Sequence, residues 1–141
     1  MAFALHQIFM VSQADTNLRT HTRAYARYLD ILEEHALGNF RDLLEEVTLS
    51  PAMGIYLSHM RNRKDDPATG GLPDENFARE VMQLFTIGLH ELNVNGTLKL
   101  NAQGRPVETY TNADVMALAK VFTGWSWAFR ACPEFCVRGI A

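Results

Sequence analysis

The stretch that decides the fold runs from Asp74 to Leu89 and reads DENFAREVMQLFTIGL. At about 100° of rotation per residue, its apolar and polar side chains fall on opposite arcs of a helix. The apolar arc consists of Phe77, Val81, Leu84, Phe85 and Gly88. The polar arc consists of Glu75, Asn76, Arg79, Glu80, Gln83 and Thr86. Because Asp74 is a good helix cap, the pattern predicts an amphipathic helix over residues 74–88.

Helical spacing continues on both sides of this stretch. Apolar side chains recur every three or four residues in four segments before it and in one after it. Ser50 and Pro51 make a favourable helix start, and Thr111 with Asp114 resembles a capping box. The sequence therefore predicts a mainly α fold in which about six helices pack in an orthogonal or bundle-like array.

The segment after the long helix changes character. Leu92, Val94, Leu98 and Leu100 alternate with polar residues around the turn signal NG at 95–96. A second turn signal, QG, follows at 103–104. We predict one small β-hairpin near 92–107, and we expect no internal repeat in the chain.

Length and charge limit the function classes. The chain has 141 residues, of which 48% are hydrophobic, so one domain with a real core is expected. The net charge is −3, and neither half is basic, which argues against nucleic acid as a partner. No stretch approaches the roughly 20 apolar residues that cross a bilayer, so we predict no transmembrane segment.

The polar arc of the 74–88 helix supplies the main site hypothesis. Asn76, Glu80 and Gln83 form a narrow stripe of amides and one carboxylate, with Arg79 beside it. A solvated face is the ordinary explanation of such an arc. The alternative is a ligand-facing wall, in which Glu80 is the candidate acid or base and Arg79 holds an anion.

Trp125 and Trp127 are further ligand-binding candidates. Their spacing allows both rings to share one face and to stack on a sugar or a protein partner, although tryptophans after a helix often cover the core. Asn93 and Asn95 imitate the front of a calcium loop, but Ala102 replaces the expected glutamate. We therefore favour a hairpin turn there and predict no metal site.

The two cysteines, Cys132 and Cys136, are four residues apart. They are compatible with two independent thiols, a local disulfide or half of a metal site. The first two interpretations are favoured, because a soft-metal site usually needs four ligands and the chain has no second cysteine pair.

Several blocks of the sequence resemble one family. The residues PDENFAREVMQLFTIGL at 73–89 are similar to the signature of the bacterial DUF1800 family, a domain of unknown function. The other similar blocks, in chain order, are AFALHQIF at 2–9, GNFRDLL at 38–44, SPAMGIYL at 50–57, LNVNGT at 92–97, TY at 109–110 and VFTGW at 121–125.

The resemblance covers residues 2–127 and implies a mainly helical fold, a bacterial origin and export, to the periplasm or beyond. Family members are several times longer, so we expect a central piece of a larger domain, with missing parts of that domain among its partners. Residues 1–127 are then part of a single helical domain, and residues 128–141 are a divergent or truncated tail. The resemblance implies no established reaction and no cofactor.

Two functions remain open at this stage. The first is a binding or scaffold domain of an exported bacterial protein, with a protein or a glycan as partner. The second is a hydrolase-type enzyme with a polar pocket around Asn76, Arg79, Glu80 and Gln83. Burial separates them, because a pocket requires these side chains to share a cleft.

Overall fold

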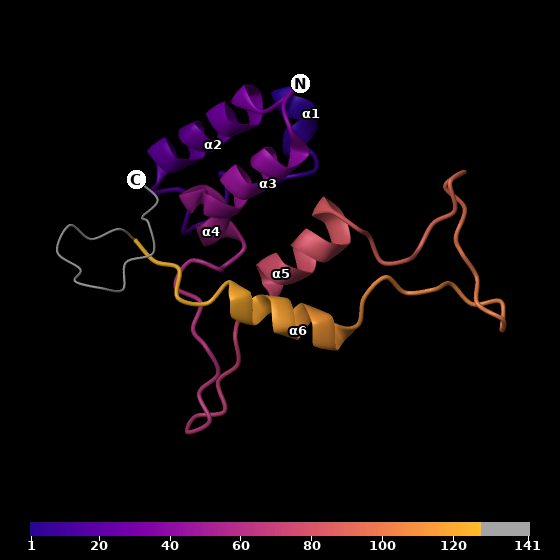
Figure 1. Cartoon of the computed structure of the whole chain (residues 1–141). Coiled ribbons are helices and arrows are strands. Elements are labelled where there is room, and N and C mark those ends of the chain that lie inside the picture. Colours follow the sequence, from indigo (N-terminus) through magenta and orange to yellow (C-terminus); the bar gives the residue numbers. More distant parts are fainter. Residues whose placement is uncertain (128–141) are drawn as a thin grey trace.

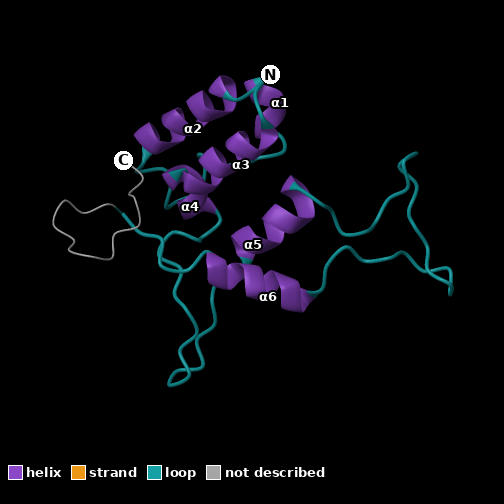
Figure 2. Cartoon of the chain, in the orientation of Figure 1, coloured by secondary structure: helices purple, strands orange, loops and turns teal. Residues whose placement is uncertain are grey.

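Helices form the regular structure of this chain in the computed structural model, which describes residues 1–127 (Figures 1 and 2). Cys132, Cys136 and the expected tail at 128–141 lie outside the described residues. The helices are α1 Ala2–His6, α2 Thr22–Glu34, α3 Phe40–Leu49, α4 Pro51–Tyr56, α5 Asn76–Glu80 and α6 Asn112–Val121. A π-helical turn, Val81–Phe85, continues α5. None of the helices in residues 1–127 has the length and hydropathy needed to cross a bilayer.

Local signals fix several helix ends. The side chain of Asn39 accepts the Arg41 N–H at 2.8 Å and caps α3. Pro51 occupies the first turn of α4, where its missing N–H is no loss. Thr111 and Asp114 form the predicted capping box at the start of α6. The mainly helical fold is therefore confirmed.

The main core lies among α1–α4 and α5. Tyr28 of α2 is fully buried, and its hydroxyl donates to the carbonyl of Phe9. This bond satisfies a polar group inside the core and ties the first segment of the chain to α2. The other buried members of this core are Val11, Leu18, Leu32, Leu43, Val47, Ala52, Met53, Phe77 and Phe85.

A smaller cluster joins α5 to α6. Ala78 packs there with Val115 and Ala119. Phe122 contacts both clusters, and its ring meets Phe77 edge-on at 4.9 Å between centroids. The pair α5–α6 is thereby attached to the rest of the core through aromatic packing.

The predicted helix over 74–88 is only partly correct. The α-helix ends at Glu80, and the π-helical turn that follows has wider, i→i+5 spacing. This spacing breaks the 3.6-residue period, so Leu84 is 61% exposed although the pattern put it on the buried arc. Phe77 and Phe85 are buried as predicted, because the turn brings Phe85 back onto the core.

The predicted β-hairpin near 92–107 is wrong, because the described residues contain no strand. Residues 88–110 form an extended loop, here called the arm, that projects from the helices (Figure 1). Only isolated bridges occur in it, between Leu92 and Leu98 and between Leu100 and Pro106 among others. Two tight turns, eight residues apart, leave each extended piece too short to form a ladder.

The arm contains a short repeat that we did not expect. The octad ELNVNGTL at 91–98 is followed by KLNAQGRP at 99–106. In each copy the asparagine N–H bonds across the turn, from Asn93 to the Thr97 carbonyl and from Asn101 to the Arg105 carbonyl, both at 2.8 Å. Gly96 has φ 80° and Gly104 has φ 74°, a conformation that favours glycine.

Candidate functional site

The segment after α4 holds its backbone in an unusual conformation. Ser58 has φ 59° and Arg61 has φ 66°, and neither residue is glycine. Such left-handed conformations cost on the order of 1 kcal/mol or more each and persist only where surrounding contacts impose them. Here the Met60 N–H donates to the Gly54 carbonyl at 2.9 Å, and the Arg61 N–H donates to the Trp125 carbonyl at 2.7 Å.

Hydrogen bonds connect this segment to the start of α5. Asn62 is buried, and its amide bonds both the N–H and the carbonyl of Asp74, at 2.8 and 2.9 Å. The Ser58 hydroxyl donates to the Asp74 carboxylate at 2.9 Å, and the Asn76 amide donates to the Ser58 Oγ at 3.0 Å. The predicted ligand-binding residue Asn76 is thus already engaged in holding this turn.

His59 lies inside the protein between the two strained residues. Its Nε2 bonds the Thr48 carbonyl at 2.9 Å, and its ring stacks on Phe77 at 3.9 Å between centroids. Because a carbonyl only accepts, Nε2 carries the proton, and the buried Nδ1 has no partner among the described residues. Burial lowers the pKa of His59, and the bond to Thr48 opposes this in part.

The strained segment also lines a cavity beside an aromatic pair, His21 and Trp127. These two rings stack with centroids 5.7 Å apart and an interplanar angle of 16°. The cavity, here called the α4-side cavity, has a volume of about 510 Å³. Besides the aromatic pair it is lined by Thr16, Asn17, Thr20, Gly54, Ile55, Ser58, Met60 and Arg61.

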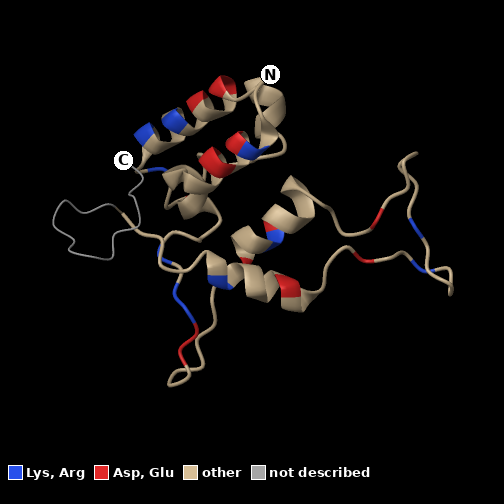
Figure 3. Cartoon of the chain, viewed as in Figure 1, with Lys and Arg blue, Asp and Glu red and all other residues tan. Residues whose placement is uncertain are grey.

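A second cavity, of about 570 Å³, shares the aromatic pair as part of its wall and lies at the start of α2. In this α2-side cavity the other lining residues are Thr20, Thr22, Arg23, Ala24, Arg27 and Pro51. Figure 3 shows that basic residues occupy one half of α2 and acidic residues the other. The two linings together hold three arginines and no acidic residue among the described residues.

The three arginines are not equivalent. Arg27 forms an ion pair with Glu34 at 2.7 Å, and the bond to this carboxylate raises the pKa of Arg27. Arg23 and Arg61 are exposed, and neither forms an ion pair within residues 1–127. Arg23 and Arg61 are therefore the cations with the most capacity to bind a ligand at these cavities.

The residues of the stripe predicted on the 74–88 helix have different surroundings. The Arg79 guanidinium donates to the Glu75 carboxylate and to the Asn112 side chain, and the bond to Glu75 raises the pKa of Arg79. Gln83 lies in the π-helical turn, off the period of the α-helix, and is half-buried. None of the four stripe residues lines the two cavities at the aromatic pair or the two cavities that follow below.

Glu80 is a separate observation within that stripe. Its Oε2 is buried and has no hydrogen-bond partner among the described residues, and the same holds for the Tyr110 hydroxyl. Unpaired buried oxygens are rare in folded proteins, because each loses its hydration without compensation. Glu80 therefore remains a candidate for a role that its present contacts do not explain.

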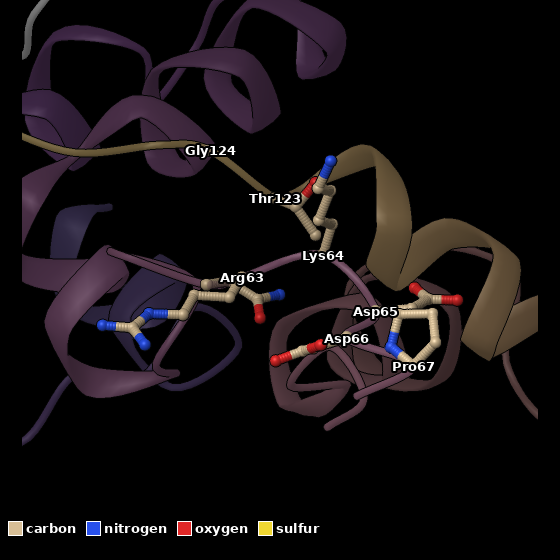
Figure 4. Close-up of a pocket in the computed structure, with 8 residues that line it drawn as sticks. Arg63, Lys64, Asp65, Asp66, Pro67, Thr123 and Gly124 are labelled. Atoms are coloured by element: carbon tan, nitrogen blue, oxygen red, sulfur yellow. The ribbon is translucent and has the colours of Figure 1, made fainter. Parts of the chain in front are cut away.

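A third cavity, of about 770 Å³, follows the loop after the strained segment (Figure 4). Both carboxylates of this cavity already have partners within the protein. Asp65 pairs with Lys120 at 2.7 Å, and Asp66 accepts hydrogen bonds from the Thr69 hydroxyl and the Ala68 N–H. These bonds lower the pKa of both carboxyl groups. Figure 4 shows the two basic side chains, Arg63 and Lys64, pointing away from each other, so they do not converge on a ligand.

The remaining predicted residues are dispersed. Trp125 lines a cavity against α3 and does not contribute to the two cavities at Trp127. Asn93 donates to the Thr97 Oγ1 at 3.0 Å, and Asn95 accepts from the same hydroxyl at 2.8 Å. Both asparagines thus hold the arm's turn, and no cluster of three histidine, cysteine or acidic side chains in the described part is arranged for a metal ion.

Comparison with known proteins identifies the family. The model of DUF1800, described as a protein of unknown function, matches residues 1–139. The chain belongs to the DUF1800 family. Neither the curated proteins nor the solved structures provided a match.

The DUF1800 match includes both cavities at the aromatic pair and extends beyond residue 127, where the resemblance was expected to end. Of the residues at these cavities, the sequence singled out Trp127 and missed His21, Arg23, Ser58 and Arg61. No glycine or turn motif marks Ser58 and Arg61 as left-handed. The segregation of basic and acidic residues along 22–34 was the one available signal, since it leaves the first turns of that helix cationic.

Proposed function

We propose that this chain is a binding domain that holds a saccharide against the aromatic pair. The observation that carries the proposal is the stack of His21 and Trp127, two rings that line both cavities. Flat aromatic surfaces suit the C–H faces of sugar rings, and the indole N–H of Trp127 is a donor for a sugar hydroxyl. The Nδ1 of His21 already bonds the Asn17 carbonyl at 3.0 Å, so His21 contributes its ring face. Concave sites with a few convergent polar groups are the usual setting for such ligands.

The polar lining supports the same ligand class. Asn17, Thr20 and Ser58 supply an amide and two hydroxyls to the α4-side cavity. These groups both donate and accept hydrogen bonds, as a sugar hydroxyl does. Ser58 is fixed through Asp74 and Asn76, so part of the wall is organised before a ligand arrives.

The test measures binding of the whole chain to a panel of soluble polysaccharides by isothermal titration calorimetry. Trp127→Ala is expected to weaken binding by about tenfold or more, since a central aromatic side chain contributes about 2 kcal/mol in many interfaces. Trp125→Ala is the matched control, because it removes an indole from a different cavity. Equal losses in both variants, or no binding by the wild type, would reject the proposal.

The wider setting of this function is also a proposal. We propose that the protein is exported by a bacterium, as the family resemblance implies, and a glycan outside the cytoplasm is a suitable ligand for an exported domain. We propose no nucleic-acid partner, since the net charge is −3. The alternative role is that of a scaffold, with a protein as the partner.

A hydrolase is the second candidate function, favoured by the unpaired buried Oε2 of Glu80. In that case Glu80 is the acid or base, and Asn76, Arg79 and Gln83 surround the substrate. Glu80→Gln then abolishes turnover in a screen of ester, phosphate and glycoside substrates while the melting temperature stays the same. A lower melting temperature without any detectable wild-type turnover would assign Glu80 to structure alone.

A further inference from the structure

We infer that the saccharide bound at the aromatic pair is anionic, carrying carboxylate or sulfate groups that Arg23 and Arg61 hold. This inference rests on the proposed saccharide site and adds the class of ligand. Arg23 belongs to the α2-side cavity and Arg61 to the α4-side cavity. The two cations thus stand at separate cavities that share one aromatic wall.

The charge at these cavities differs from that of the whole chain. The protein has a net charge of −3, yet the two cavity linings are cationic. A guanidinium binds carboxylate and sulfate oxygens through paired, charge-assisted hydrogen bonds. A neutral sugar would leave Arg23 and Arg61 without a partner at the site, whereas an anionic one matches them.

Arg27 contributes little to the positive charge of the α2-side cavity, because it is already paired with an acidic residue. Its guanidinium holds Glu34, at the other end of α2, at 2.7 Å. Arg23 is one helical turn nearer the start of α2, where the first turn contains no acidic residue. The free cation of the α2-side cavity within residues 1–127 is therefore Arg23.

The arrangement favours a chain of sugars over a small anion. A single sulfate or phosphate reaches one cavity only, whereas the stacked rings line both. A saccharide with a charged group on successive units places a ring against Trp127 and an anion in each cavity. The side-chain amide of Asn17, which lines the α4-side cavity, can then bond a sugar hydroxyl.

The experiment compares polymers that differ in charge. Polygalacturonate supplies carboxylates, carrageenan supplies sulfates, and dextran is neutral, and each is titrated against the whole chain at low and at high salt. An anionic polymer is expected to bind at least tenfold more tightly than dextran at low salt, and added salt reduces this preference. The two anionic polymers separate carboxylate from sulfate recognition.

Variants identify the cations responsible. The double variant Arg23→Ala/Arg61→Ala is expected to lose about tenfold in affinity for the anionic polymer and most of the salt dependence. Arg105→Ala, in the arm, is the matched control and leaves both unchanged. If melting curves show that the alanine variant is damaged, Arg23→Gln/Arg61→Gln replaces it, because glutamine keeps a long polar side chain without charge.

The possible failures are distinguishable. Equal binding of dextran and the anionic polymers overturns the charge inference and leaves the saccharide site in place. Binding that survives the double arginine substitution also overturns the inference. No binding to any polymer rejects both proposals. A single-stranded oligonucleotide is titrated in the same way. If it binds more tightly than the polymers and Trp127→Ala weakens that binding, the ligand is a nucleic acid and not a saccharide.

Discussion

The helical core and the arm contain similar apolar residues, which are buried in the core and exposed in the arm. In the core, Leu18, Leu32 and Phe9 are fully buried. In the arm, Leu100 is 60% exposed and Val94 is fully exposed. Burial of a large apolar side chain stabilises a fold by about 1.5–3 kcal/mol, so the two regions cannot owe their structure to the same force.

The arm is held by backbone hydrogen bonds, by the asparagine side chains of its turns and by a Lys99–Glu91 ion pair at 2.9 Å. The Glu91 N–H donates to the Val107 carbonyl, the Val107 N–H to the Lys99 carbonyl, and the Lys99 N–H to the Glu91 carbonyl, at 2.9 to 3.0 Å. These three bonds form a closed ring between the short extended pieces. The comparison teaches that turn chemistry and a few backbone bonds suffice to shape the arm, whereas the helices need burial.

The largest expected effect comes from the aromatic centre of the core. Phe77→Ala removes a buried ring that packs on His59, Phe85 and Phe122. The free energy of unfolding should fall by about 3–5 kcal/mol in urea denaturation. Leu100→Ala in the arm is the control and should change it by no more than about 0.5 kcal/mol. Similar losses in both variants would contradict the contrast between the regions.

A second test uses pH. Burial lowers the pKa of His59 below its ordinary value of 6.5. Below pH 6.5 His59 is protonated in the unfolded chain but not yet in the folded chain. The free energy of unfolding therefore decreases as the pH falls from 7 to 5. The slope is at most about 1.4 kcal/mol per pH unit for one group.

The matched variants for this test are His59→Gln and His90→Gln. Glutamine at 59 keeps an N–H for the Thr48 carbonyl and removes the titration, so urea denaturation at pH 5, 6 and 7 should show a flatter profile. The same change at His90, in the arm, should leave the profile as in the wild type. An unchanged slope in His59→Gln would assign the acid sensitivity to other groups.

A third, smaller effect is expected at a buried hydrogen bond. Tyr28→Phe removes the hydroxyl that donates to the Phe9 carbonyl and keeps the ring. The expected loss is about 1 kcal/mol, measured from the shift of the urea midpoint. A neutral result would mean that water replaces the hydroxyl, and the site would then be less tightly packed than the core around it.

The smallest expected effect tests the independence of the arm. The Thr109 N–H bonds the Leu89 carbonyl at 3.1 Å, so the two ends of the arm already meet at its base. Replacing residues 90–108 by an Asn-Gly turn should change the free energy of unfolding by less than about 0.5 kcal/mol. A large loss in urea denaturation would show that the arm supports the helices.

Local patterns predicted much of the fold and little of the candidate site. The helix starts at Ser50–Pro51 and at Thr111 were predictable, because each depends on neighbouring residues alone. The stripe of Asn76, Glu80 and Gln83 depended on an uninterrupted α-helix, and the π-helical turn at Val81–Phe85 interrupts it. No residue type in the sequence predicts such a turn, because the turn depends on the packing of Phe85 into the core.

The sequence by itself determined the helical class, the family, the turns at Gly96 and Gly104 and the cationic first half of α2. Only the tertiary structure decided that His21 stacks on Trp127 and that Ser58 and Arg61 are strained beside them. The physical reason is range. Caps, turns and charge patterns act over a few residues, whereas the aromatic pair joins positions more than one hundred residues apart, which only the packing of the chain brings together.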